Sequence, residues 1–66
     1  MGTEYRILLA LDRICTEYEQ STPTPNQSQK LYLRYKVAAL KAKSSSPDIM
    51  YIADQLLEKI NSLAVV

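Results

Sequence analysis

Apolar residues recur at helical spacing along three stretches of the chain, and two breaks separate these stretches. The first break is the Ser/Thr/Pro-rich stretch 21–25, whose two prolines cannot both lie inside a helix. The second break is the run of three serines before Pro47. The pattern predicts helices over residues 4–20, 25–44 and 47–64. We therefore expect an all-α, three-helix fold, in which the second and third helices form a helical hairpin and an N-terminal helix completes one small domain over residues 1–66.

Capping signals predict where two of these helices begin. Thr24 is expected to cap the middle helix, because Pro25 then occupies its first position and Gln27 stands at capping-box spacing from the cap. Ser46 is expected to cap the third helix, with Pro47 at its first position. Both signals are local in the sequence and place each start within a few residues.

The first and third helices each show one broad apolar stripe, which is typical of a helix that packs on a core. The stripe of the third helix consists of Ile49, Ile52, Ala53, Leu56, Leu57, Ile60, Leu63 and Ala64. The stripe of the first helix consists of Ile7, Leu8, Leu11, Ile14, Cys15 and Tyr18. Tyr5 and Leu9 fall outside that stripe and form a candidate contact patch.

The middle helix differs because it is apolar on two sides. One side, here called the Tyr35 face, consists of Leu31, Tyr35, Ala38, Ala39 and Ala42, with Tyr32 at its edge. The other, the Leu33 face, consists of Leu33, Val37 and Leu40. Two interpretations are open. Either the middle helix is sandwiched in a closed three-helix bundle, or one face is reserved for a second copy or for a different protein.

Composition leaves few ways to stabilise so small a core. The chain has 66 residues, one cysteine and no histidine, so neither an intramolecular disulfide nor a structural zinc site is expected. A core of this size supplies on the order of 3–5 kcal/mol of net stability. Association with a protein partner, or as a homo-oligomer, is the expected way to bury more surface. No apolar run approaches the roughly 20 residues of a membrane span, so we expect a cytoplasmic protein without membrane contact.

The available residue types argue against catalysis. Without histidine, the commonest general base and metal ligand is missing. Cys15 lies on the core stripe without a basic partner and is expected to be a buried, inert thiol. Asp54 and Glu58 form a carboxylate pair on the polar side of the third helix, where a solvated surface is the simpler interpretation. We expect no enzyme, cofactor, metal or small-molecule substrate.

Charge is distributed unevenly along the chain. Residues 23–46 carry five basic and no acidic side chains, namely Lys30, Arg34, Lys36, Lys41 and Lys43. Residues 1–22 hold two basic and four acidic side chains, and residues 47–66 hold one basic and three acidic. Basic residues beside Tyr32 and Tyr35 are compatible with nucleic-acid binding. The net charge of +1 falls short of a basic footprint, so the cations are expected to orient acidic helices instead.

The arrangement of Gln27–Lys43, joined through Ser44–Pro47 to Asp48–Ala64, resembles the helical hairpin of small type III secretion co-chaperones. The resemblance is architectural and covers the hairpin alone. It implies a cytoplasmic protein that joins a tetratricopeptide-type chaperone and holds the needle subunit unpolymerised.

The sequence therefore predicts a non-catalytic protein-protein interaction module or co-chaperone that binds a helical partner. The Leu33 face and its flanking lysines are expected to dock on that partner. The candidate partner-binding residues are Leu33, Val37, Leu40, Tyr35, Ala38, Lys36, Lys43, Tyr5 and Leu9. The alternative is a small nucleic-acid-binding regulator that uses the basic middle helix, in particular Lys30, Arg34 and Lys41. A small structural subunit is the remaining hypothesis.

Overall fold

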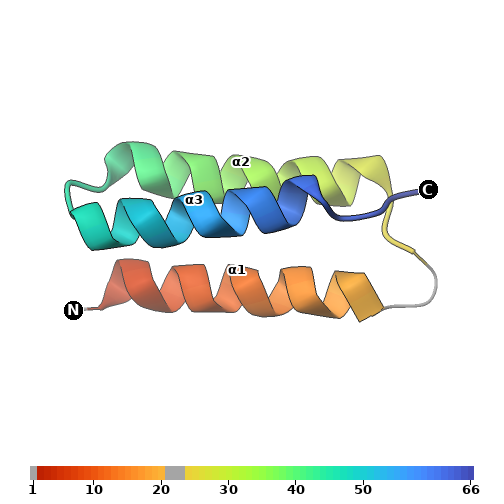
Figure 1. Ribbon diagram of the computed structural model, residues 1–66, viewed down its shortest axis with the longest axis horizontal. Coiled ribbons are helices and arrows are strands. Elements are labelled where there is room, and N and C mark those ends of the chain that lie inside the picture. Colours follow the sequence, from red (N-terminus) through yellow and green to blue (C-terminus); the bar gives the residue numbers. More distant parts are fainter. Residues whose placement is uncertain (1, 21–23) are drawn as a thin grey trace.

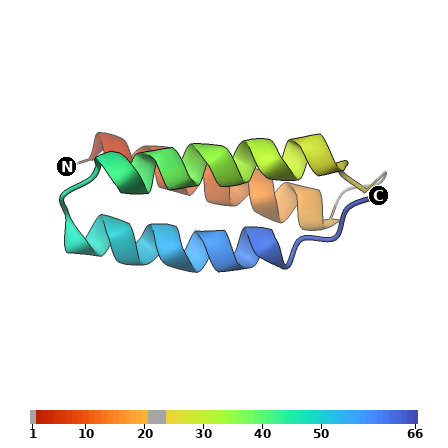
Figure 2. The ribbon, with the colours of Figure 1, turned by 90° about the horizontal axis from the view of Figure 1, so that it is seen from above.

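The structure is a computed structural model, and it describes residues 2–20 and 24–66. These residues form three helices, α1 (Thr3–Gln20), α2 (Gln27–Lys43) and α3 (Pro47–Asn61), and no strand. Consecutive helices run antiparallel along the long axis of the molecule, so α1 and α3 point the same way (Figure 1). Every pair of helices packs together, and the views of Figure 1 and Figure 2, at right angles to each other, show the three helices side by side as a bundle. The predicted all-α, three-helix fold is confirmed.

Asn26, and not Thr24, caps α2. Its side-chain oxygen accepts the backbone N–H of Gln29 at 2.9 Å, and the Gln29 side chain accepts the backbone N–H of Asn26 at 2.8 Å. This reciprocal pair satisfies two backbone donors that the helix itself leaves unpaired. The predicted cap at Thr24 is therefore wrong, and Pro25 lies before the helix. Part of the predicted break, residues 21–23, lies outside the described residues.

Ser46 caps α3 as the sequence predicts. Its hydroxyl accepts the backbone N–H of Ile49 at 3.4 Å, and Pro47 occupies the first helical position. Proline suits this position because its missing N–H would have no partner inside the helix. The turn between α2 and α3 is short, which fixes these two helices as a hairpin.

The C-terminal end of the chain packs against the start of α2. α3 ends at Asn61, earlier than the predicted residue 64. The Lys30 ammonium donates hydrogen bonds to the carbonyl oxygens of Asn61 at 3.1 Å and Leu63 at 3.0 Å, where the helix dipole favours a cation. Leu63 is buried, and the backbone N–H of Val66 donates to the carbonyl of Pro25 at 3.1 Å. The tail therefore covers the end of the bundle.

The core runs along the bundle axis and takes residues from all three helices. Its buried members are Leu8, Leu11, Cys15, Leu33, Val37, Ala53, Leu56 and Ile60. Leu33 is 1% exposed and Val37 0%, and the half-buried Leu40 packs against the same cluster. The Leu33 face is thus the inward face of α2. The prediction that it stays free for a partner is wrong, and the closed bundle is the arrangement observed.

Two properties of α2 explain why the Leu33 face turns inward. This face offers three branched aliphatic side chains and no polar group, whereas the Tyr35 face would bring a phenol into the core, with a hydroxyl to satisfy. Lys30 and Lys41 also lie on the α3 side of the inward face. Lys41 pairs with Asp54 of α3, and Lys30 binds the end of the same helix. Packing and charge therefore favour one rotation of α2.

Polar contacts attach α1 to the hairpin near both ends. The Lys59 ammonium donates to Asp12 at 2.8 Å and to the Thr16 hydroxyl at 2.7 Å. At the opposite end, the Ser44 hydroxyl donates to the Glu4 carboxylate at 3.2 Å. These contacts set the position of α1 along the groove between α2 and α3.

The inward rotation of α2 can be tested with two leucines that differ mainly in burial. Leu33→Ala should destabilise the fold by about 2–4 kcal/mol, because it leaves a cavity in the core. Leu31→Ala, at a position 47% exposed, should cost less than about 1 kcal/mol. Urea unfolding followed by circular dichroism measures both values. Equal losses in the two variants, or a larger loss for Leu31→Ala, would contradict this placement.

Candidate protein-binding surface

The Tyr35 face lies on the solvent side of α2. Tyr35 is 69% exposed, and Leu31, Ala38 and Ala42 are also exposed, with Tyr32 at the edge. The positions 31, 35, 38 and 42 follow steps of four, three and four residues, the spacing with which one helix packs along another. α2 is therefore apolar toward the core and again toward solvent. This outward stripe is the candidate binding surface.

The stripe changes in shape along the helix. The large side chains of Leu31 and Tyr35 project from its N-terminal half, whereas the short side chains of Ala38 and Ala42 form a shallow C-terminal half. Small residues at a helix surface let the backbone of a second helix approach closely. The outward face of α2 thus combines a ridge with a shallow depression.

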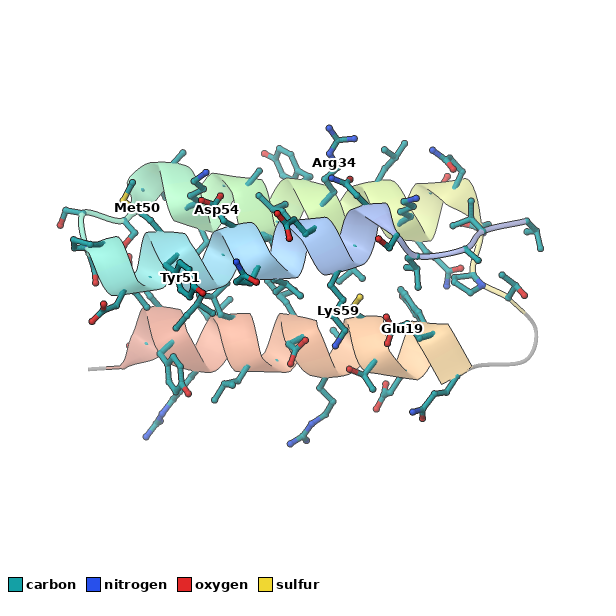
Figure 3. All side chains as sticks on the ribbon, in the orientation of Figure 1. Glu19, Arg34, Met50, Tyr51, Asp54 and Lys59 are labelled. Atoms are coloured by element: carbon teal, nitrogen blue, oxygen red, sulfur yellow. The ribbon has the colours of Figure 1, made fainter. Side chains whose placement is uncertain are left out.

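Cations edge this stripe, and only some of them are engaged elsewhere in the molecule. Lys30 and Lys41 bind α3, as described above. Arg34 points away from the bundle (Figure 3), and the Lys36 ammonium lies 5.5 Å from the centre of the Tyr32 ring. Within residues 2–20 and 24–66, no ion pair engages Arg34, Lys36 or Lys43. Because α2 has no acidic residue, the stripe has a positive border.

Tyr5 and Leu9 lie on a different surface. Both are exposed on α1, and Tyr5 borders an open hollow of about 810 Å³ between the starts of α1 and α3. The residues that line it are Gly2, Thr3, Glu4, Tyr5, Ser46, Asp48, Ile49, Tyr51 and Ile52. Leu9 is not part of this lining. The hollow combines apolar walls with hydroxyl groups and the carboxylates of Glu4 and Asp48, and its lining includes no lysine or arginine.

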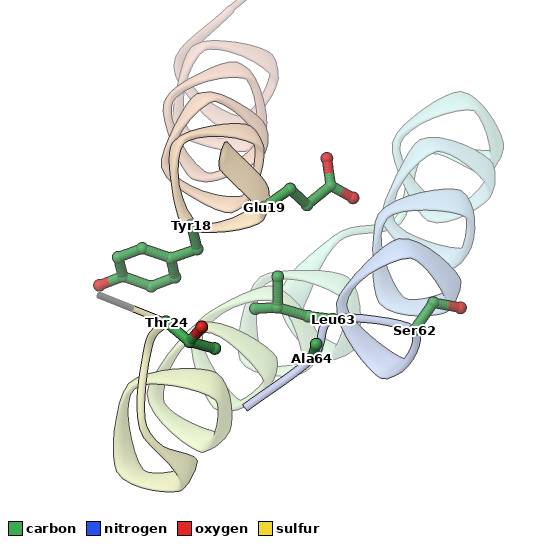
Figure 4. A pocket seen from close by; sticks show the side chains of 6 residues that line it. All are labelled: Tyr18, Glu19, Thr24, Ser62, Leu63 and Ala64. Carbon is green, nitrogen blue, oxygen red and sulfur yellow. The ribbon is translucent and has the colours of Figure 1, made fainter. Parts of the chain in front are cut away.

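A second, smaller hollow of about 360 Å³ lies at the other end of the bundle. Its lining consists of Tyr18, Glu19, Thr24, Ser62, Leu63 and Ala64 (Figure 4). The hydroxyl groups of Tyr18 and Ser62 point away from each other in this view, so they do not converge on a common point. Its geometry therefore gives no support to a catalytic function.

Cys15 is fully buried in the core. Burial raises the pKa of its thiol, and the nearby Glu19 carboxylate raises it further. A raised pKa keeps the thiol protonated at neutral pH, which is the unreactive form. The described residues contain no group of three acidic or thiol side chains placed to hold a metal ion. None of the helices in these residues combines the length and apolar character needed to cross a membrane.

The predicted partner-binding residues therefore separate into three places. Leu33 and Val37 lie in the core, with Leu40 half-buried beside them. Tyr35 and Ala38 lie on the outward side of α2, with Lys36 and Lys43 along one edge. Tyr5 and Leu9 lie on α1. The structure does not bring these groups together in one site.

Leu31, Tyr32 and Arg34 also lie on the exposed surface of α2, although none of them is among the predicted protein-binding residues. The signal that could have found them is the tyrosine hydroxyl. Of the two apolar faces of α2, the Leu33 face carries no hydroxyl group that would need a buried partner, so it is the better core face. The residues opposite it are then the exposed ones.

No protein-family model, curated protein or solved structure matches the chain.

The contact between α3 and α1 predicts a dependence of stability on alkaline pH. The hydrogen bond to Asp12 raises the pKa of Lys59 above its ordinary value of 10.5. Because the pKa is higher in the folded state, the protonated Lys59 stabilises the fold fully at any pH below the pKa of the unfolded chain. This stabilisation is lost as the pH rises through the pKa of the folded state. Lys59→Met should therefore lower stability at about pH 8 and flatten its decline toward about pH 11.

Urea midpoints across this pH range measure the effect, and Lys43→Met, which removes an exposed lysine without an ion pair, is the matched control. Parallel pH profiles for the wild-type protein and Lys59→Met would show that Lys59 does not stabilise the fold in this way. The pKa of the buried Cys15 thiol is also raised above its ordinary value of 9.0. This thiol therefore makes stability decline further as the pH rises above that value.

Proposed function

We propose that this protein is a non-catalytic protein-interaction module that binds a helix of its partner along the Tyr35 face. The observation that carries the proposal is the exposed stripe of Leu31, Tyr35, Ala38 and Ala42 at the spacing of a helix seam. A helix that is apolar on the side away from its own core leaves unburied surface, and a partner helix is the element that fits such a stripe.

The chemistry of the stripe supports the same function. Tyrosine and arginine are the residues that most often dominate binding energy at protein interfaces, because they combine apolar area with polar or charged ends. Tyr35 is exposed on the outward side of α2, with Tyr32 on one side of it and Arg34 on the other. Alanines beside them allow close packing. Large side chains beside a shallow alanine surface are well suited to bind a helix.

A more specific form of this proposal is a co-chaperone of type III secretion in the cytoplasm. The hairpin of α2 and α3 supports it through the resemblance described above, and the exposed stripe supplies a surface for a chaperone or needle subunit. The cytoplasmic location and the identity of the partner are parts of this proposal.

The nucleic-acid alternative has less support than it had from the sequence. Its basic stripe consists of Lys30, Arg34 and Lys41, and two of these three residues bind α3. The exposed Tyr32 and Tyr35 still offer rings for base stacking. Oligonucleotide binding is therefore included in the tests below as a competing outcome.

Two tyrosines offer a matched test of the proposed surface. Tyr35 on α2 is 69% exposed and Tyr51 on α3 is 66% exposed, so both tolerate substitution without loss of core packing. Tyr35→Glu should weaken binding of the native partner by about 30-fold, the size of an interface hot spot. Tyr51→Glu should leave binding within about twofold. Affinity capture from the native source identifies the partner, and titration of the purified partner measures both affinities.

Circular dichroism should show that both variants keep the helical fold. A partner that binds Tyr35→Glu as tightly as wild type would exclude the Tyr35 face as its binding surface. Loss of binding only in Tyr51→Glu would assign the function to the hollow between α1 and α3 instead.

A further inference from the structure

The border of the Tyr35 face has one sign of charge on both sides. At 100° per residue, Arg34 falls beside one edge of the stripe, and Lys43 and Lys36 fall on the other side of it, beyond Tyr32. All three are exposed, and no ion pair with a described residue neutralises them. A helix that lies along the stripe would place its own flanking residues beside these cations. Acidic flanks would be attracted on both edges, whereas basic flanks would be repelled.

A second copy of the chain fits this surface poorly. In an antiparallel pair of α2 helices, Leu31 would oppose Ala42 and Tyr35 would oppose Ala38, so the sizes would match. The same pairing would bring together the unpaired cations of both copies, Arg34, Lys36 and Lys43, with no acid on either α2 helix. Like charges at such distances oppose association.

The other helices of a second copy do not supply the missing element. α1 exposes Tyr5, Ile7 and Leu9, but Tyr5 and Leu9 cover a single turn, and Arg6 and Arg13 lie along one side of them. The outward face of α3 presents Tyr51, Gln55 and Glu58, with one aromatic ring and no continuous apolar stripe. Neither helix combines an apolar seam with two acidic edges. The charge complementarity therefore favours a different protein.

On these grounds, and resting on the proposed function, we infer that the occupant of the Tyr35 face is an acidic amphipathic helix of another protein. Its apolar residues repeat at steps of three and four along one stripe, and carboxylates flank the stripe on both sides. Its bulky side chains lie opposite Ala38 and Ala42, and its small ones lie opposite Leu31 and Tyr35. The charges fix the class of partner, and the alanines fix where its large residues pack.

Two synthetic helices of about 20 residues test this inference, since shorter peptides are marginally helical. Both carry the same leucine and alanine stripe, one with glutamate flanks and the other with lysine flanks. In fluorescence anisotropy titrations, the glutamate peptide should bind at least about tenfold more tightly than the lysine peptide. Its affinity should fall by about tenfold as salt rises from about 0.05 M to about 0.5 M. Tyr35→Glu should abolish binding, and Tyr51→Glu should not.

Two pairs of substitutions then separate local charge from net charge. The double variant Arg34→Gln/Lys36→Gln should weaken binding of the glutamate peptide by about tenfold. Arg6→Gln/Arg13→Gln removes the same net charge from the outward face of α1 and should leave the affinity within about twofold. Ala38→Leu should also weaken binding by filling the depression, whereas Ala10→Leu on α1 should not.

The inference fails if the lysine peptide binds as tightly as the glutamate peptide, or if the glutamate peptide does not bind. It also fails if a single-stranded oligonucleotide binds more tightly than the peptide in a Tyr35-dependent way, or if the protein dimerises through Tyr35 in sedimentation experiments. A native partner that depends on Tyr35 but docks through a segment without acidic residues would overturn the acidic-helix inference and leave the proposed function standing. A native partner that is indifferent to Tyr35→Glu would overturn the proposed function.

Discussion

The rotation of α2 about its own axis is the constraint on which the rest of the structure depends. The helix is apolar on two opposite sides, so hydrophobic burial alone allows two ways to place it in the bundle. Burial of Leu33 and Val37 favours one of these two rotations, and the contacts of Lys30 and Lys41 with α3 stabilise the same rotation. Once this rotation is set, the position of Tyr35 on the surface follows without any further interaction.

The same rotation divides the basic residues of α2 into two groups. Lys30 and Lys41 point toward α3, whose acidic residue and C-terminal carbonyl groups they bind. Arg34, Lys36 and Lys43 remain exposed, Arg34 on one side of the stripe and the two lysines on the other, beyond Tyr32. The basic middle of the chain therefore has two physical roles. One part orients the hairpin, and the other part gives the outward surface its charge.

Much of the fold could be predicted from sequence because its signals are local. The breaks and the Ser46 cap depend on residues a few positions apart, where proline and serine chemistry acts directly on the backbone. The choice between Thr24 and Asn26 as the cap of α2 was not decided locally, because both residues stand three positions before a glutamine. The structure places Pro25 before the helix, where its carbonyl accepts a bond from Val66 at the far end of the chain.

The candidate site could be predicted only in part, since the decisive contacts join distant positions. Helical periodicity located both apolar faces of α2 but did not determine which one is buried. That choice depends on the cost of burying a tyrosine hydroxyl and on contacts such as the one between Lys41 and Asp54, which are 13 positions apart. As a result, Tyr35 and Ala38 were correctly placed on an apolar stripe, while Leu33 and Val37 were assigned to the wrong side of the molecule.

Solvent paramagnetic relaxation measured by NMR tests the rotation of α2 most directly. A soluble gadolinium chelate broadens resonances in proportion to their exposure, so it compares both faces of the same helix in one sample of the unmodified protein. The account predicts strong broadening of the Leu31 methyl and Tyr35 ring signals, and protection of the Leu33 and Val37 methyl signals. Protection of Leu31 and Tyr35 together with broadening of Leu33 and Val37 would contradict it.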